Sequence, residues 1–304
     1  MTEQAINPQD QLTRFMFETY PVRGLQVNLQ QVWQHVGENK KYPAAIKQAL
    51  GELTVAAVLL ASNLKFEGSL IVQVQGSGIL KMLVAEATSS GTCRATARWD
   101  ESALIDDDMS LVDLLGSGGM FVLTLQPTHG ESWQGVVELA GDSIAQMLMN
   151  YMARSEQLAT YIALAADDNH AGGLLLQRLP GQDIEEDCWT ELTALAETVK
   201  KDELLHLPAE ELLYRLFHEH EVRLLAQQPI EFACTCSRTK VSDMLLLLGG
   251  QEVGEAVAEE GSIQINCDFC HANYVFDEAD VNTLFGQDIV ETAKQQLHAQ
   301  QRNH

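Results

Sequence analysis

Alternating apolar and polar residues predict a β-hairpin in the first third of the chain. Leu70, Val72 and Val74 occupy every second position, glycines 76 and 78 supply turn residues, and the apolar run ILKMLVAE follows. This period of two is typical of strands with one buried face. Three further strands are predicted at residues 92–99, 120–126 and 133–139.

Two longer segments have helical character. Residues 43–61 form one predicted helix, in which Pro43 suits the first turn, and residues 142–164 form another, with Asp142 as a possible N-cap. Strands in succession, with helices between and after them, indicate an α+β fold. No period of 20 to 50 residues recurs in the sequence, so a solenoid is excluded.

The character of the chain changes after Pro180. Residues 182–220 lose their strand signals and predict two amphipathic helices, with Pro208 near the start of the second. Each helix carries an apolar stripe, which comprises Ile184, Cys188, Leu192, Leu195 and Val199 in the first and Leu212, Leu213, Leu216 and Phe217 in the second. Such helices need an apolar partner, and ordinary docking helices are the simplest interpretation.

Composition places the chain among globular proteins. Of its 304 residues, 46% are hydrophobic and 20% are charged. The apolar run from Leu53 to Leu64 is interrupted by polar residues and is too short to cross a bilayer, so no membrane span is expected. The N-terminal residues lack the pattern of a secretory signal, and we therefore expect a cytoplasmic protein.

The charge and the motifs narrow the range of functions. A net charge of −24 repels nucleic acid and anionic lipid, so neither is an expected partner. The sequence contains no Walker motif, nucleophile elbow or His-Glu-x-x-His motif. We therefore predict that the protein is not an enzyme.

Four of the six cysteines form two close pairs. Cys234 and Cys236 are one residue apart, and Cys267 and Cys270 follow as a C-x-x-C pair. Two such pairs separated by a loop are typical of a closed tetrahedral zinc site, in which four thiolates hold one Zn²⁺. The C-x-C spacing is the less usual element of this pattern. A zinc-binding domain is predicted here, because a cytosolic compartment disfavours a static disulfide framework.

Other interpretations of these residues remain open. The run from Cys267 to His271 matches a haem-attachment motif, and C-x-x-C also occurs in thiol-disulfide oxidoreductases. A permanently folded zinc module for protein contacts is a further alternative. His218 and His220 are expected to be surface histidines. The isolated Cys93 and Cys188 are expected to be small buried hydrophobes.

The zinc module is small enough for the metal to control its folding. A segment such as 231–285 gains little from its own core, about 3 to 5 kcal/mol, whereas zinc supplies roughly 10 to 16 kcal/mol. Oxidation of the thiolates would release zinc and unfold the module. The helices of 182–220 would then lose a packing partner and expose their stripes to unfolded chains. The candidate residues for binding such unfolded chains, here called clients, are Ile184, Leu192, Leu195, Val199, Leu212, Leu213, Leu216 and Phe217.

Several segments together resemble the thirty-three-kilodalton heat-shock protein family of redox-regulated holdase chaperones. They are VRG (22–24), YPAAIKQALGEL (42–53), LKFEGSLIVQVQG (64–76), WQGVVELAG (133–141), YMARSEQLAT (151–160), GLLLQRLP (173–180), FACTCS (232–237) and INCDFCHANYVF (265–276). The resemblance implies an α+β core domain at 1–180, a helical linker at 181–230 and a zinc-binding redox switch at 231–304.

The resemblance also implies a mechanism. All four cysteines bind zinc in the reduced, inactive form, and oxidation forms the disulfides Cys234–Cys236 and Cys267–Cys270, a pairing that proximity along the chain also favours. The C-terminal part then unfolds, and the protein holds unfolding client proteins without ATP. The active form is expected to be a homodimer.

Overall fold

The computed structural model describes residues 10–38, 40–64, 67–181, 185–286, 289–291 and 293–294. It divides into two compact units, Met1–Ala233 and Cys234–His304. The described part combines three β-sheets with helices, so the predicted α+β class is confirmed. The finer division at residues 180 and 230 stays a prediction.

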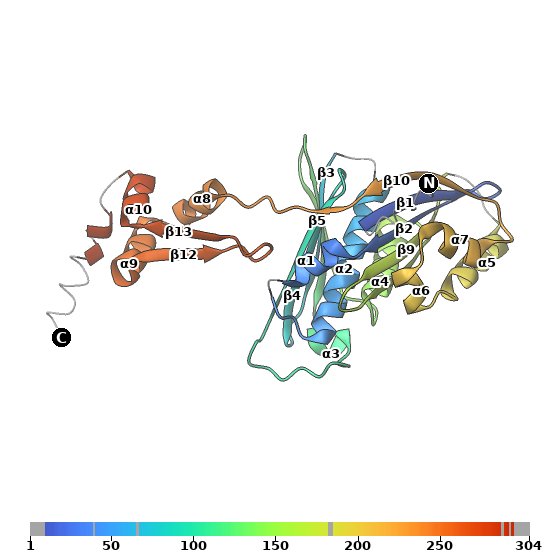
Figure 1. The fold of residues 1–304 in the computed structure, drawn as a ribbon, viewed down its shortest axis with the longest axis horizontal. Coiled ribbons are helices and arrows are strands. Elements are labelled where there is room, and N and C mark those ends of the chain that lie inside the picture. The colour runs from blue at the N-terminus through green and yellow to red at the C-terminus, as the bar shows by residue number, and fades with distance from the viewer. Residues whose placement is uncertain are drawn as a thin grey trace, which may run out of the picture. The chain divides into compact units, whose positions relative to one another are not determined.

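The first sheet of the N-terminal unit has five strands, and every neighbouring pair is antiparallel. In spatial order they are β10 (Val222–Pro229), β1 (Asp10–Phe17), β2 (Val22–Leu29), β9 (Ala171–Arg178) and β8 (Thr160–Ala166). Strand β10 thus joins a segment of the predicted linker to a strand near the start of the chain (Figure 1).

The second sheet contains the predicted hairpin and has six strands. In spatial order they are β11 (Glu231–Phe232), β5 (Thr92–Trp99), β4 (Leu80–Thr88), β3 (Gly68–Gln75), β6 (Met120–Pro127) and β7 (Trp133–Glu138). Strand β11 is parallel to β5, and the other pairs are antiparallel. The strands expected from residue 68 to residue 139 are therefore present.

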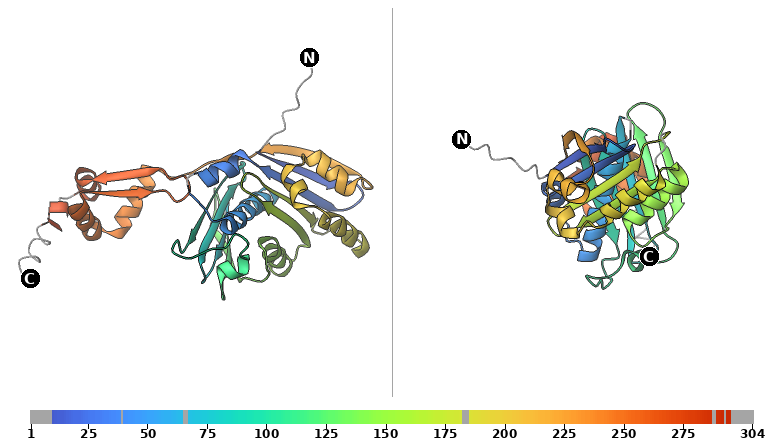
Figure 2. Two further views of the ribbon diagram at one scale, coloured as in Figure 1. Left: turned by 60° about the horizontal axis from the view of Figure 1, so that its bottom comes forward. Right: turned by 90° about the vertical axis from the view of Figure 1, so that its right-hand side faces the viewer.

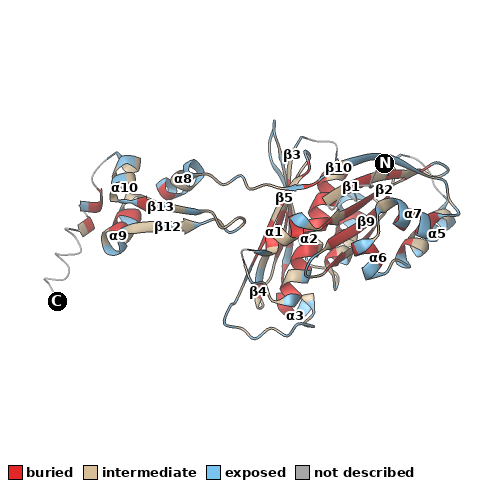
Figure 3. Cartoon of the chain, in the orientation of Figure 1, coloured by how far each residue is buried: buried red, intermediate tan, exposed pale blue. Residues whose placement is uncertain are grey.

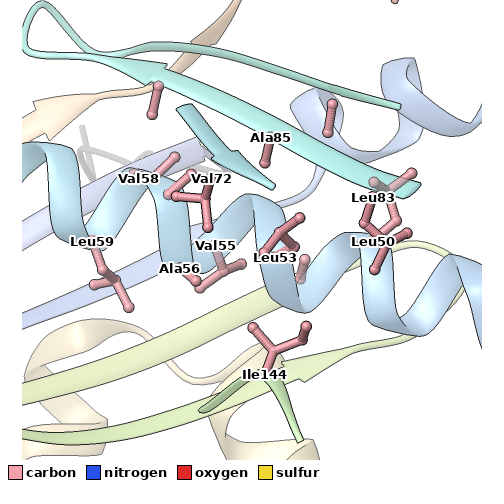
Figure 4. Packing of buried hydrophobic residues seen from close by; sticks show 14 of the residues in the cluster. Leu50, Leu53, Val55, Ala56, Val58, Leu59, Val72, Leu83, Ala85 and Ile144 are labelled. Carbon is pink, nitrogen blue, oxygen red and sulfur yellow. The ribbon is translucent and has the colours of Figure 1, made fainter. Parts of the chain in front are cut away.

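Helix α2 (Ala44–Asn63) fills the space between the two sheets. Most of its residues are buried, and they contact strands of both sheets (Figure 4). Among the described residues it is the one helix long and apolar enough to cross a membrane, although 72% of its apolar window is buried inside the fold. The apolar run that begins at Leu53 in the sequence is shorter than this helix, because α2 begins nine residues earlier, at Ala44. Burial on all sides explains its apolar composition.

Four shorter helical segments complete this core. They are α1 (Gln31–Glu38), α3 (Leu111–Leu115), α4 (Ile144–Tyr151) and the π-helical turn η1 (Met152–Glu156). The helix predicted for 142–164 is therefore too long, because Gln157 adopts a left-handed conformation with φ 56° and the chain continues as β8. Its N-cap is Ser143 rather than Asp142, since the Ser143 hydroxyl accepts a hydrogen bond from the Gln146 N–H.

The segment predicted as two helices forms three in its described part, namely α5 (Glu186–Glu197), α6 (Lys201–His206) and α7 (Ala209–Phe217). They lie on the face of the first sheet opposite α2 (Figure 2). Strand β9 shows the division, because Leu175 packs in the α2 core while Leu174 and Leu176 pack with the three helices. Buried residues therefore line both faces of this sheet (Figure 3).

The C-terminal unit has its own small core. Its elements are α8 (Arg238–Leu248), α9 (Gly250–Glu260), β12 (Ser262–Asn266), β13 (Asn273–Asp277) and α10 (Glu278–Phe285). Strands β12 and β13 form an antiparallel hairpin. The buried side chains of its core cluster are Leu245, Val253, Val257, Phe276, Val281, Ile289 and Val290.

Candidate metal centre

The four paired cysteines come from two segments of the C-terminal unit. Cys234 and Cys236 lie in the extended stretch between β11 and α8, and Cys267 and Cys270 lie in the turn of the β12–β13 hairpin. The last register pair of the hairpin, Asn266 with Asn273, places the C-x-x-C turn at its tip. A hairpin end and an adjoining extended segment thus bring the predicted pairs together.

The sulfur positions fit a tetrahedral ion. The Sγ atoms of all four residues lie within 4.8 Å of one another. The Sγ atoms of Cys234 and Cys267 are 3.6 Å apart, and those of Cys236 and Cys270 are 3.3 Å apart. Four sulfurs at about 2.3 Å from a tetrahedral Zn²⁺ would be about 3.8 Å from one another. The group can therefore hold a metal ion after only small side-chain adjustments.

Backbone geometry prepares the C-x-x-C turn for thiolates. The N–H groups of Phe269 and Cys270 donate hydrogen bonds to the Cys267 sulfur, and the Ala272 N–H donates to the Cys270 sulfur. His271 makes the second contact possible by adopting a left-handed conformation with φ 55°, which is uncommon outside glycine. The turn is closed by hydrogen bonds between the backbones of Cys267 and Ala272, at 3.0 Å, and His271 and Cys267, at 2.8 Å.

Tyr274 adds a side-chain donor to the cluster. Its hydroxyl donates to the Cys236 sulfur over 3.1 Å. This hydrogen bond, followed by burial, raises the pKa of Tyr274 to about 12, because ionising the phenol would place a negative charge beside the sulfurs. Such an outer-shell donor orients a ligand and supports its negative charge. Tyr274 was not predicted from the sequence, because its contact with Cys236 depends on the path of the hairpin backbone.

The thiols hold their protons firmly when no metal competes for them. Burial, assisted by hydrogen bonds that the Cys270 thiol donates to the neighbouring sulfurs, raises the pKa of Cys270 to about 12, and burial also raises the pKa of Cys267. A metal ion must therefore displace protons as it binds.

The two remaining cysteines lie in the N-terminal unit. Cys93 is buried in β5, and burial raises its pKa to about 12, so its expectation as a small buried hydrophobe is confirmed. Cys188, in the first turn of α5, is only half-buried and hydrogen-bonds with Tyr20. The expectation of full burial is wrong for Cys188, because α5 begins at the edge of the helical layer.

The two predicted surface histidines, His218 and His220, differ in their exposure. His218 is exposed, as expected. His220 is not a surface histidine, because its side chain is 8% exposed and its ring packs edge-on against Phe17 and Tyr20. Residue 220 lies beyond the end of α7, where the chain turns its ring toward Phe17 of the first sheet.

The candidate client-binding residues lie beneath the surface. Leu192, Leu212, Leu213, Leu216 and Phe217 are buried, and Leu195 and Val199 are half-buried in the same cluster, whereas Ile184 lies outside the described residues.

Their packing partners come from the first sheet and include Phe15, Phe17, Leu174 and Leu176. The expectation that the zinc module covers these stripes is therefore corrected, because the second apolar face of the sheet provides the cover. Leu204 and Leu205 of α6 belong to the same cluster and were missed, although the LL pair in KDELLH was visible.

Comparison with known proteins agrees with this architecture. The family model described as Hsp33 protein matches residues 10–277. A 33 kDa chaperonin of Neisseria meningitidis serogroup A is 63% identical over 294 residues, which cover 97% of each chain, and one of Chromobacterium violaceum is 50% identical, over 96% of this chain and 99% of its own.

A solved structure has the same fold. The crystal structure of the 33 kDa chaperonin of Thermotoga maritima aligns with a TM-score of 0.79 at 22% identity, covering 91% of this chain and 98% of the other. At that identity the likeness concerns the fold, whereas the family match and the closely similar chaperonins extend over nearly the whole sequence. The chain therefore belongs to the Hsp33 family.

Proposed function

We propose that this protein is a redox-regulated, ATP-independent holdase of the cytoplasm. In the reduced and inactive state, Cys234, Cys236, Cys267 and Cys270 hold one Zn²⁺. The observation that carries the proposal is the convergence of four sulfurs within 4.8 Å in a chain of a chaperone family. Four soft thiolate ligands favour zinc among the common divalent ions.

Zinc would supply much of the folding free energy of the C-terminal unit. The core cluster of that unit contains only seven buried apolar side chains in its described part. A core of this size contributes only about 3 to 5 kcal/mol, whereas a structural zinc contributes roughly 10 to 16 kcal/mol. Loss of the ion therefore shifts this unit toward its unfolded state.

Oxidation would remove the ion by converting its ligands into disulfides. Each disulfide forms when two thiolates lose two electrons in total, and a peroxide takes up these electrons as it is reduced to water or alcohol. In the folded site, the short contacts between sulfurs join Cys234 to Cys267 and Cys236 to Cys270. The proposed pairing, Cys234 with Cys236 and Cys267 with Cys270, therefore requires the site to open as the disulfides form.

Client binding would use the apolar stripes of α5 and α7. Because these stripes pack on the first sheet, the helices must undock before they can contact a client. Undocking exposes both the helix stripes and the sheet face that bears Phe15 and Phe17. An apolar surface of this kind suits unfolding proteins, and a homodimer would present it twice.

Nucleic-acid binding, membrane binding and catalysis lie outside the proposed function. A net charge of −24 argues against nucleic acid and anionic membranes as partners. Cys267 and Cys270 lie at the tip of an antiparallel hairpin rather than beside a βαβ unit, which argues against a thioredoxin-like oxidoreductase. We therefore propose a binding protein without catalytic activity.

The test combines metal, thiol and chaperone measurements on one sample. Zinc content, free thiols and suppression of client aggregation are measured before and after peroxide treatment. We expect one zinc per reduced chain, loss of that zinc together with four thiols, and a gain in suppression. Full suppression by the reduced, zinc-loaded protein would refute the switch, and zinc retained under peroxide would indicate a constitutive zinc module.

Catalysis is tested separately. Turnover of a model disulfide by the variant Cys234→Ser/Cys236→Ser would establish an oxidoreductase that uses Cys267 and Cys270. We expect no turnover above the rate of a small thiol.

A further inference from the structure

A second group of metal-ligating side chains lies in the N-terminal unit. One potential ligand atom from each of Asp167, His170 and His206 lies within 4.8 Å of the other two. Asp167 and His170 belong to the turn between β8 and β9, and His206 is the last residue of α6. The cluster therefore joins the helical layer to the sheet that it covers.

The turn holds its two ligands in place through its own hydrogen bonds. The Asp167 Oδ1 atom accepts hydrogen bonds from the backbone N–H groups of Asn169 and His170, both at 2.7 Å. The Asp167 carbonyl accepts a hydrogen bond from the Trp33 indole at 2.8 Å. The His170 Nδ1 atom lies 3.7 Å from the Asp167 Oδ1 atom. A carboxylate and an imidazole are thus presented together on a tight, well-anchored hairpin.

His206 is oriented in the manner of a metal-binding histidine. Its Nδ1 atom lies 2.9 Å from the Asp202 carbonyl oxygen and 3.1 Å from the Asp202 Oδ1 atom. Because both of these atoms are acceptors, Nδ1 carries the proton and Nε2 carries the lone pair. A carboxylate or carbonyl behind the non-ligating nitrogen is the usual outer-shell partner of a metal-bound histidine.

The backbone of α6 approaches the sheet closely at this point. A Cβ atom added at Gly172 would lie 2.4 Å from the Leu204 carbonyl oxygen, so only glycine permits this approach. The Asn28 side chain donates a hydrogen bond to the Leu207 carbonyl at 3.0 Å. The rings of His170 and His206 consequently meet edge to face, with centroids 4.6 Å apart.

We propose that Asp167, His170 and His206 form a second site, for a divalent transition-metal ion, which fastens α6 to the β8–β9 hairpin. Two imidazoles and one carboxylate suit Zn²⁺, Co²⁺ or Fe²⁺ and leave further coordination positions to water. Ligand atoms on such an ion are about 3 to 3.5 Å apart, so a small movement of the half-exposed His206 side chain completes the site on binding.

Metal binding here would oppose undocking of the helical layer. The ion would connect His206 to the hairpin that also contributes Leu174 to the core beneath α5–α7. The existence of the site is independent of the redox proposal, and only its regulatory meaning, stabilisation of the inactive docked state, rests on it. The metal and the thiolate centre would then both favour the inactive protein, through different units.

The test uses Co²⁺ as the probe on the untagged, reduced full-length chain. Co²⁺ bound by nitrogen and oxygen ligands gives visible absorption bands but lacks the sulfur-to-metal charge-transfer band of a thiolate site. The absorption spectrum therefore reports the occupancy of the two centres separately. We expect one equivalent at the nitrogen and oxygen site. His170→Ala and His206→Ala should each weaken this binding at least about tenfold, and His218→Ala, at an exposed histidine of the same layer, should not.

Hydrogen exchange then tests the fastening. At a metal concentration about ten times the dissociation constant, opening of α6 should be suppressed about tenfold, and this protection should disappear in His206→Ala. Absence of the sulfur-free cobalt bands in the parent chain, or equal bands in all three variants, would overturn the site. Binding without slower exchange in α6 would overturn the fastening. Neither result depends on chaperone activity.

Discussion

Phe217 offers a direct test of the idea that the helical layer conceals the client surface. Its side chain is buried at the end of α7, and its ring meets the Phe17 ring edge-on, with centroids 5.1 Å apart. Phe17 belongs to the first sheet. Phe217→Ala therefore removes a contact between the helices and the sheet without touching the α2 core.

The expected cost follows from the packing. Truncation of a buried phenylalanine costs about 3 to 5 kcal/mol, which includes the cavity that remains. If that cost falls on docking of the helices, the undocked fraction rises more than about 100-fold, because each 1.4 kcal/mol changes an equilibrium tenfold. The reduced, zinc-loaded variant should then bind clients in part, without any oxidant.

Two readouts on the reduced protein test this expectation. Hydrogen exchange should accelerate in α5–α7, and suppression of client aggregation should rise. Tyr214→Ala is the control within the same helix, because that side chain is 74% exposed and its removal should change stability by less than about 0.5 kcal/mol. Leu70→Ala is the control for general destabilisation, because Leu70 is buried in the other core.

The possible results distinguish helix packing, the client surface and general unfolding. Unchanged exchange in α5–α7 of Phe217→Ala would show that the packing estimate is wrong. Faster exchange without a gain in aggregation suppression would show that the covered surface is not the client surface. An equal gain in Leu70→Ala would assign the effect to unfolding in general rather than to undocking.

Three further predictions concern single side chains. His271→Gly should retain or strengthen metal binding because glycine adopts φ 55° without strain, whereas His271→Val should weaken it; competition with a chelator measures both, and equal affinities would contradict this account. Tyr274→Phe removes the donor to Cys236, so zinc affinity should fall about 10- to 100-fold, and peroxide should release zinc faster. Burial raises the pKa of Glu52, so the folded state loses stability as the pH rises above the ordinary value of 4.5 and Glu52 is forced to ionise. Glu52→Gln should therefore raise the melting temperature more at pH 7.5 than at pH 4.5. An equal rise at both pH values would refute this assignment.

Sequence periodicity predicted several strands that have one covered face, such as β3, and failed at β9, where both faces are covered. Strand β3 alternates cleanly, with Leu70, Val72 and Val74 buried and the residues between them half-buried. Strand β9, AGGLLLQR, is buried along almost its whole length, because α2 covers one face and α5–α7 cover the other. It therefore shows no period of two, and β8 was absorbed into a predicted helix for a similar reason.

The cluster of four cysteines was predictable because cysteines are rare and these four have a characteristic spacing. Sequence alone could not give the partner of the amphipathic helices, since an apolar stripe specifies only that some apolar surface covers it. Tyr274 and the left-handed His271 were equally out of reach, because their roles depend on the path of the hairpin backbone.

On the proposed mechanism, the connection between the two units determines how metal loss reaches the helical layer. The Ala233 N–H donates a hydrogen bond to the Cys93 carbonyl, and Cys234 follows directly. Strand β11, just before this point, contributes only two residues to an edge of the second sheet, so its release breaks few bonds.

Strand β10 comes next and is itself an edge strand of the first sheet. It follows α7 after only four residues, and Val222 packs in the same cluster as Phe217. Strands β11 and β10 are both edge strands. Unfolding can therefore proceed from Cys234 back to α7 while α2 and the central strands of both sheets stay folded. On the proposed mechanism, the client surface thus lies at the end of a route made of edge elements, which would let a four-cysteine centre control helices that pack against another part of the chain.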